Sequence, residues 1–154
     1  MQTFYDDSRF LDMVASMPLV SIDLLVEDSS GRYLLGRRTN RPAQGTLFVP
    51  GGRILKDECI SHALGRVVRK ELGIHPNLGD WRACGVYQHF YDDNFKGESG
   101  VSTHYIVLAY RLKLLTEPRI EFDAQHSEMH WLSVDALLAR DDVHQYTKAY
   151  FVNM

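Results

Sequence analysis

The sequence predicts a mixed α/β fold in which one sheet lies between helices on two sides. Strand-like segments dominate the middle of the 154-residue chain, one helical segment is inserted among them, and other helical segments lie toward the two ends. Sheets and amphipathic helices each bury an apolar face, and helices on both faces of one sheet satisfy that requirement. The chain has no repeat, low-complexity tract or linker, so residues 1–154 are expected to form a single domain.

The first third of the chain predicts one short helix followed by strands. Residues 4–16 have one apolar side and end before Pro18, which does not fit inside a helix. Over residues 19–27 aliphatic residues alternate with mostly polar ones, which is the period of a strand, so Asp23 is expected to face away from the aliphatic side. The following turn, strand, loop and short strand are expected at residues 29–31, 33–38, 40–45 and 47–49.

A helix interrupts the strands in the middle of the chain. It follows Pro50-Gly51-Gly52, is expected to be capped near Asp57, and ends at Gly73, which adopts a left-handed C-cap without strain. Polar loops are expected over residues 91–103 and 116–127. The other elements are strands at residues 81–90, 104–115 and 129–132, a helix capped at Ser133, and a last helix from about Val143.

Composition and charge exclude several classes of function. The 17 Lys and Arg against 20 Asp and Glu give a formal net charge of -3, without a basic run that would follow nucleic acid or an anionic membrane. The sequence has neither an apolar stretch of membrane-spanning length nor the apolar core of a signal peptide. Cys59 and Cys84 lack the spacing of a metal site and are expected to be reduced thiols. We therefore expect a cytoplasmic protein that binds neither nucleic acid nor membrane.

One carboxylate lies where an apolar residue would be expected. With 100° per residue, the helix carries Glu71 in the middle of an apolar stripe. The other residues of that stripe are Ile60, Ala63, Leu64, Val67 and Val68. Burial and the negative end of the helix dipole both disfavour the ionised form of Glu71. A cation should offset that cost, and a divalent metal is the simplest candidate.

Residues 52–74 carry a spaced motif: Gly52, five residues, Glu58, seven residues, Arg66, and then Val-Val-Arg-Lys-Glu-Leu-Gly-Ile. This motif, placed between a strand and the end of a helix, resembles the box of the Nudix hydrolases, Gly-x5-Glu-x7-Arg-Glu-U-x-Glu-Glu-x-Gly-U, where U is aliphatic. The element order resembles that family over nearly the whole chain. The resemblance implies a Nudix-type α/β/α sandwich and hydrolysis of a nucleoside diphosphate derivative.

Two departures from the box change the expected mechanism. In the usual member, the glutamates bind several Mg²⁺ ions and deprotonate the water that attacks phosphorus. Here Val67 and Lys70 stand where two of those glutamates would be. The remaining groups are sufficient for one Mg²⁺, an ion that usually keeps waters and substrate phosphates among its six oxygen ligands.

Stretches outside the box resemble one branch of the family, whose members act on GDP-mannose. These stretches are residues 18–23, 35–45, 48–53, 88–95, 103–105 and 125–126. The resemblance implies hydrolysis of GDP-mannose, and of related GDP-hexoses, to GDP and free sugar, with water attacking and inverting the anomeric carbon. It also implies one Mg²⁺ per subunit with Mn²⁺ as a substitute, a homodimer, and a role in sugar-nucleotide supply for polysaccharide biosynthesis.

Attack at carbon is compatible with a depleted box. It expels GDP, a good leaving group once Mg²⁺ and arginines spread its charge, so the site needs no strong general acid. The water still needs a base, which a loop histidine of near-neutral pKa can supply. By resemblance that base is His126, with a solvated loop histidine as the alternative. The metal ligands implied by resemblance are the backbone carbonyl of Gly51, the carboxylate of Glu71 and the amide oxygen of Gln125.

The remaining roles implied by the resemblance concern the substrate. The residues that help the diphosphate depart are Arg38, Arg53 and Arg66, since guanidinium forks suit phosphate oxygens. By resemblance, Asp23, His89 and Tyr105 orient the sugar and Phe10 packs on guanine. Arg38 and Tyr91 are further residues expected to bind the substrate.

Several alternatives stay open from the sequence. Arg66 could instead hold Glu58, which is expected to be structural, and Phe10 could be a core residue. Residues 91–100 are either a lid or a polar hairpin tip. Two rival functions also remain: a nucleotide-sugar diphosphatase in which water attacks phosphorus, and a nucleotide-sugar-binding module without turnover.

Overall fold

The computed structural model describes residues 5–75, 81–114 and 126–154, except for the side chain of His126. The helices are α1 (Asp7–Ser16), α2 (Ile60–Leu72), α3 (Val134–Ala139) and α4 (Gln145–Ala149). The strands are β1 (Leu19–Glu27), β2 (Tyr33–Arg38), β3 (Leu47–Phe48), β4 (Gly51–Arg53), β5 (Arg82–Tyr91), β6 (Thr103–Lys113) and β7 (His126–Leu132).

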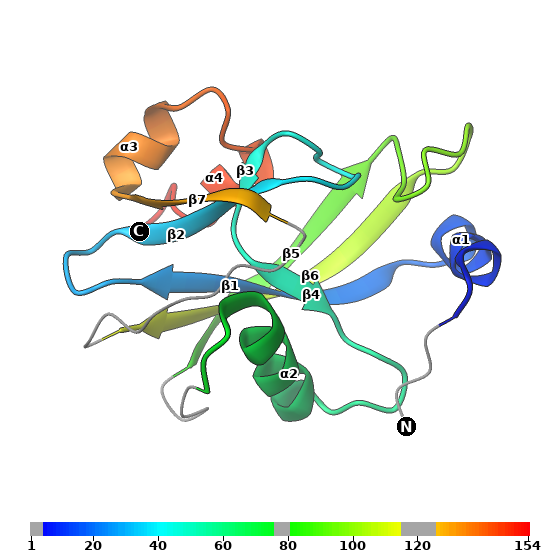
Figure 1. Ribbon diagram of the computed structural model, residues 1–154, viewed down its shortest axis with the longest axis horizontal. Helices are drawn as coiled ribbons and strands as arrows, with labels where there is room; N and C mark the ends of the chain where they lie inside the picture. Colours follow the sequence, from blue (N-terminus) through cyan, green and yellow to red (C-terminus); the bar gives the residue numbers. More distant parts are fainter. Residues whose placement is uncertain (1–4, 76–80, 115–125) are drawn as a thin grey trace.

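The strands form one mixed sheet of seven strands, as predicted (Figure 1). Its main path runs β3-β2-β1-β6-β5, with β4 paired to β1 and β7 paired to β2. β1 and β6 run parallel, whereas the other pairs are antiparallel. In Figure 1, α2 lies on one side of the sheet, and α3 and α4 lie on the other. The predicted α/β fold with a sheet between helices is therefore confirmed.

The central strand β1 is buried on both faces, and its alternation divides the core into two layers. Ile22, Leu24 and Val26 pack with the apolar residues of α2 in one cluster. Leu25 points to the opposite face and packs with residues of β3, α3 and the C-terminal segment. Asp23 lies on that second side, as the alternation predicts, and is buried. The alternation of side chains along β1 therefore builds the core and also places the Asp23 carboxylate in the interior.

Helix α2 differs from its prediction at its beginning. Its N-cap is Cys59, without a side-chain cap hydrogen bond, and not the predicted Asp57. Asp57 has a backbone φ of +65°, so it belongs to the turn that precedes the helix. Ile60, predicted in the apolar stripe, is 46% exposed because it lies in the first turn, before the helix reaches the sheet. Gly73 is the left-handed C-cap, as predicted.

Three other boundaries differ from the prediction. No strand was predicted at residues 51–53, but the backbone of β4 pairs with β1. β7 begins at His126 and not at residue 129, and pairs with Arg38 at that point, so His126 lies at a strand end. α1 begins after Asp6, whose side chain accepts a hydrogen bond from the Arg9 N–H at 2.8 Å.

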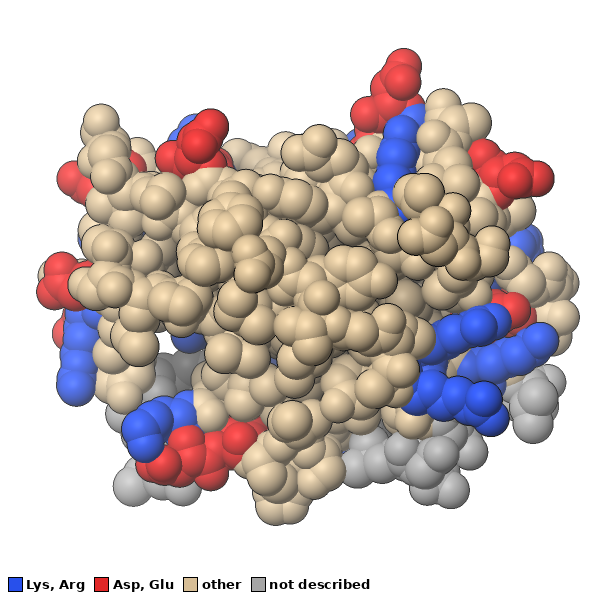
Figure 2. Space-filling model, turned by 180° about the vertical axis from the view of Figure 1, so that it is seen from behind, with Lys and Arg blue, Asp and Glu red and all other residues tan. Residues whose placement is uncertain are grey.

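Charged residues are distributed unevenly over the surface. Figure 2 shows that, on the side opposite to the view of Figure 1, Lys, Arg, Asp and Glu gather toward the margins of the described surface and leave its centre uncharged. On that face, positive and negative side chains lie next to each other at several places. None of the described helices is long and apolar enough to cross a membrane.

Candidate active site

A cavity of about 480 Å³ opens between β1, β4, α2 and the ends of β5 and β6. Its lining is made of Phe10, Ser21, Asp23, Arg38, Asn40, Arg41, Pro42, Phe48, Val49, Gly51, Gly52, Arg53, Leu55, Arg66, Val67, Lys70, Glu71, His89, Tyr91, Phe95 and Tyr105. Every predicted site residue whose side chain is described lies in this lining. Of the remaining two, Gln125 lies outside the described residues, and only the backbone of His126 is described.

The two glycines of β4 allow that strand to lie pressed between β1 and α2. A Cβ atom on Gly51 would lie 2.5 Å from both Asp23 Oδ1 and the Ile22 carbonyl oxygen. A Cβ on Gly52 would lie 3.0 Å from a methyl group of Val67. Val67, which stands where the Nudix box has a glutamate, is therefore a core residue that packs on Gly52, and it is buried. Glycine at these two positions allows the backbone of β4 to lie close to its neighbours. A left-handed backbone is not the reason, because neither glycine has a positive φ.

Among the described residues, helix α2 contributes one carboxylate to the cavity lining besides that of Asp23. Glu71 is 3% exposed, in agreement with its predicted burial within the apolar stripe. Lys70 lines the same cavity from the exposed flank of the helix. Glu71 and the Gly51 backbone supply hard oxygen donors to one cavity, which suits a divalent cation that completes its shell with water and phosphate. Within residues 5–75, 81–114 and 126–154, no three His, Cys, Asp or Glu side chains gather as a metal cluster.

Arg66 forms hydrogen bonds with Glu58, another residue of the motif at residues 52–74. Its Nε donates to Glu58 Oε1 at 2.7 Å, and its Nη2 donates to Glu58 Oε2 at 2.9 Å and to the Arg53 carbonyl at 2.6 Å. Glu58 also accepts from the Leu55 N–H at 2.9 Å. The Arg66 guanidinium lowers the pKa of Glu58. This fork is the structural arrangement that the sequence left as an alternative, and it fixes the loop that follows β4.

The other two arginines are held at the cavity wall by different means. Arg38 donates from Nε to the Pro42 carbonyl at 2.9 Å, which ties β2 to the loop after it. The guanidinium of Arg53 lies 4.0 Å from the centre of the Phe10 ring, a cation–π contact. Burial lowers the pKa of Arg53, and the nearby Arg66 adds to this effect. Phe10 also contacts Phe95 with 4.8 Å between ring centres. Phe10 thus forms part of the wall and orders a cation that faces the cavity.

Near Arg38, a largely buried polar network joins β1, β5 and the end of α4. We call it the Tyr150 network; it consists of Asp23, His89, Tyr91 and Tyr150. The Tyr150 hydroxyl donates to Asp23 Oδ2 and lies 3.2 Å from His89 Nε2. The Tyr91 hydroxyl lies 3.5 Å from His89 Nδ1. Tyr105, predicted to contact the sugar, is nearby in the lining, where burial raises the pKa of its hydroxyl.

Burial sets the protonation states of this network. It raises the pKa of Asp23 from 3.8 to about 7, although the Tyr150 hydroxyl and the charge of Arg38 act in the opposite direction. It lowers the pKa of His89 from 6.5 to about 4, and the nearby His144 adds to this effect. His89 is therefore neutral at physiological pH, and burial favours the protonated form of Asp23.

Sequence reasoning missed the contribution of the C-terminal segment to this site. Tyr150 bonds Asp23 and His89, and the ring of Tyr146 stacks on His89 with 4.3 Å between centres and 3° between planes. His144 contacts Phe48 and Tyr146. The available signal was the spacing: Tyr146 and Tyr150 lie four residues apart in a predicted helix, so they share a face.

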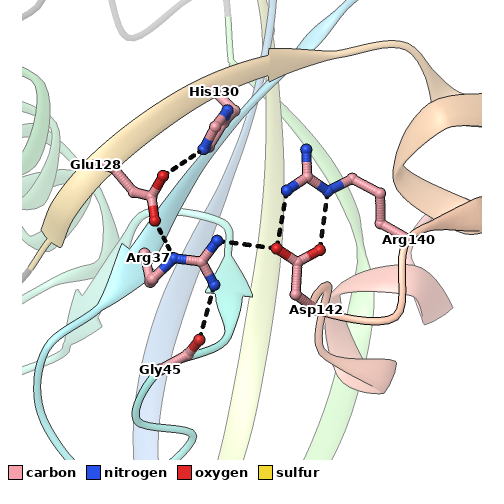
Figure 3. Close-up of polar contacts among 6 residues, drawn as sticks. All are labelled: Arg37, Gly45, Glu128, His130, Arg140 and Asp142. Carbon is pink, nitrogen blue, oxygen red and sulfur yellow. Dashed lines mark hydrogen bonds and ion pairs between the residues drawn. The ribbon is translucent and has the colours of Figure 1, made fainter.

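A second polar network lies on β2, outside the cavity (Figure 3). This Arg37 network consists of Arg37, Gly45, Glu128, His130, Arg140 and Asp142. The guanidinium of Arg37 bonds Glu128, and it also bonds Asp142 with 2.9 Å from Nη2 to Oδ2. Arg140 donates to the same carboxylate from Nε and Nη2, with two hydrogen bonds of 2.8 Å. His130 Nε2 lies 2.8 Å from Glu128. The network ties β2 and β7 to the segment before α4.

Comparisons with known proteins agree with this architecture. The model of the NUDIX domain matches residues 17–152. Low-salt glycan biosynthesis protein Agl8 of Haloferax volcanii is 39% identical over 123 residues, which cover 80% of this chain and 76% of that protein. The chain is similar in structure to the MutT protein from Methanosarcina mazei Go1, with a TM-score of 0.69, 20% identity, and 90% and 94% of the two chains covered. For the MutT NUDIX hydrolase from Burkholderia pseudomallei, the TM-score is 0.69 at 24% identity, with 88% and 97% covered.

Proposed function

The chain belongs to the Nudix domain family, and on that premise we propose that it hydrolyses GDP-mannose to GDP and mannose. One observation carries this proposal: the wall of a single cavity combines cationic groups with neutral and acidic hydrogen-bonding groups. The cationic groups are Arg38, Arg41, Arg53, Arg66 and Lys70. The hydrogen-bonding groups are Asp23, His89, Tyr91 and Tyr105. A diphosphate joined to a sugar has matching chemistry at its two ends.

The cationic groups favour departure of the diphosphate. Guanidinium groups of Arg38 and Arg53 stabilise the negative charge that develops on the leaving oxygen as the bond to the sugar breaks. Because both groups are already held by the protein, by the Pro42 carbonyl and by the Phe10 ring, little reorganisation is needed when that charge forms. Arg66 contributes mainly by fixing Glu58 and the carbonyl of Arg53.

Nudix hydrolases generally use divalent metals, and the chain retains groups for one. A Mg²⁺ or Mn²⁺ ion bound by the Gly51 carbonyl, Glu71 and Gln125 would neutralise charge on the diphosphate. The core position of Val67 and the positive charge of Lys70 argue against a site that binds several such ions.

Water must be activated on the sugar side, and we propose His126 for this role. The support is its position: β7 begins at His126, and its backbone pairs there with Arg38 of the cavity wall. His89 is a poorer candidate because burial lowers its pKa to about 4 and both its nitrogens lie near tyrosine hydroxyls. Asp23 accepts hydrogen bonds from the sugar, which orients the anomeric carbon for attack.

The test is the identity of the products in ¹⁸O-labelled water with Mg²⁺. We expect GDP and mannose, with the label in mannose. Label in a phosphate product, with GMP and mannose 1-phosphate, would replace this proposal by attack at phosphorus. Glu71→Gln is expected to lower kcat by about 100-fold or more, because the buried carboxylate supplies the charge that holds the cation. Binding of GDP-mannose without any product from the wild-type protein would indicate a binding module.

The name of one relative suggests a physiological role. The relative from Haloferax volcanii bears a name from glycan biosynthesis, which supports a role in supplying or removing sugar nucleotides for glycans. Activity on other GDP-hexoses, the homodimer, the cytoplasmic location and the single-domain organisation stay predictions. Product analysis over a panel of GDP-sugars and light scattering of the purified protein test the first two.

A further inference from the structure

The Tyr150 hydroxyl occupies a fixed position between Asp23 and His89. All three side chains are buried, with 4%, 7% and 4% of the residue exposed for Tyr150, Asp23 and His89. The hydroxyl donates to Asp23 Oδ2 and lies 3.2 Å from His89 Nε2. The Tyr150 ring packs edge-on against Tyr87, with 4.7 Å between centres. The hydroxyl therefore cannot leave one partner without a shift of the C-terminal segment.

When Asp23 is ionised, the number of protons in this network assigns the tautomer of His89. A phenol has one hydrogen to donate, and the ionised carboxylate of Asp23 can only accept. Once Tyr150 donates to Asp23, its oxygen can interact with His89 only as an acceptor, so Nε2 must carry hydrogen. A neutral imidazole carries one hydrogen, and the low pKa of His89 keeps the ring neutral. Nδ1 is then an acceptor.

The orientation of the His89 ring is favoured by its contacts. It stacks on Tyr146 with 3° between planes. The Tyr146 hydroxyl donates to the Phe90 carbonyl at 2.8 Å and accepts from the Phe90 N–H at 2.9 Å, so it is anchored to the strand that carries His89. A flip would place a carbon atom toward Tyr150 and remove the bond to its oxygen. The segment from Tyr146 to Tyr150 thus determines which atoms of His89 face Tyr150 and Tyr91.

We propose that Tyr150 is a positioning residue that holds His89 as the Nε2–H tautomer, so that Asp23 and His89 Nδ1 together receive two hydroxyl donors of the sugar. The Tyr91 hydroxyl lies 3.5 Å from Nδ1, a long contact that a ligand hydroxyl can replace. The subsite so formed consists of acceptors and selects ligands that present neighbouring hydroxyl groups. The identity of the ligand as a sugar rests on the proposed function, whereas the tautomer does not.

The tautomer is tested first, without substrate. Protein labelled with ¹⁵N in histidine is studied by NMR at about pH 8.5, where Asp23 is ionised. In the wild type, we expect His89 to show hydrogen on Nε2 and none on Nδ1. Tyr150→Phe should change this pattern to a mixture of tautomers, whereas Tyr87→Phe, which alters a neighbour outside the cavity lining, should leave it unchanged. Hydrogen on Nδ1 in the wild type, or an unchanged pattern in Tyr150→Phe, would overturn the proposal.

The role in recognition is tested by comparing a ligand with a sugar and one without. Tyr150→Phe should lower kcat/KM for GDP-mannose by about 10- to 100-fold and change the Kd of GDP less than about twofold, because GDP does not reach the acceptors. A similar loss for both ligands, or a loss for neither, contradicts a role on the sugar side. If the wild type releases no mannose, the proposed function fails, and the NMR pattern still decides the tautomer.

Discussion

The Tyr150 network and the Arg37 network perform the same structural task in opposite environments. Each ties the C-terminal part of the chain to the sheet, and each contains a carboxylate bound by residues from distant parts of the sequence. The Tyr150 network is largely buried, and the cation Arg38 lies near it. The Arg37 network lies at the surface and surrounds Asp142 with two guanidinium groups (Figure 3).

This difference moves the pKa values of the two carboxylates in opposite directions. Burial raises the pKa of Asp23 to about 7, and a single phenol hydrogen bond does not compensate. Hydrogen bonds from Arg140 and Arg37 lower the pKa of Asp142 well below its usual value. A carboxylate whose charge is expensive to maintain is better explained by a ligand than by stability. The comparison therefore supports the proposal that the Tyr150 network binds a ligand, and it favours a structural role for the Arg37 network.

The largest effect is expected from Asp23→Asn on catalysis. The variant keeps the shape of the side chain but loses the charged acceptor for a sugar hydroxyl, so kcat/KM for GDP-mannose should fall by about 100-fold or more. Asp142→Asn, which changes the matching carboxylate of the other network, should stay within about twofold of the wild type. Steady-state kinetics of both variants decide the matter, and equal losses would remove the distinction between the networks.

The second effect concerns stability and pH in metal-free protein. Between about pH 4 and pH 7, folded Asp23 retains a proton that the unfolded chain releases, so this group lowers the free energy of unfolding as the pH rises. The difference between 3.8 and about 7 corresponds to at most about 4 kcal/mol. Asp23→Asn should therefore be more stable than the wild type above pH 7, by about 1–3 kcal/mol, and gain little near pH 4.

Urea unfolding of the two proteins over this pH range measures the difference. His89 has the opposite slope, because its pKa in the folded protein is about 4 and the unfolded chain binds the proton first. That slope is common to both proteins and cancels in the comparison. A variant that is less stable than the wild type at pH 8 would show that the ionised carboxylate of Asp23 is stabilising, contrary to its buried position.

The sequence predicts the positions of Asp23 and Glu71 far better than the contacts of Tyr150. The reason is the separation, along the sequence, of the residues that contact each other. The alternation of β1 predicts the side on which Asp23 lies, and the helical period predicts the burial of Glu71, because both depend on near neighbours. Tyr150 contacts Asp23 across 127 positions and His89 across 61. Such a contact depends on how α4 packs, which no local pattern contains. Asp57 failed as a cap for a similar reason: its left-handed backbone is imposed by the turn.

The smallest effect is expected from Asp142→Asn on stability. Because the folded pKa is lowered, Asp142 stabilises the protein above the usual carboxylate pKa, and this contribution is lost as the pH falls through the lower folded value. Its side chain is 36% exposed, so water and salt screen the bonds to Arg37 and Arg140, and the loss at pH 7 should not exceed about 1 kcal/mol. In about 1 M NaCl the difference from the wild type should shrink further, whereas the effect of Asp23→Asn should change less, because Asp23 is buried and a buried charge is screened less. Thermal unfolding at low and high salt separates the two cases. A salt-insensitive loss of several kcal/mol for Asp142→Asn would mean that the surface network is as consequential as the buried one.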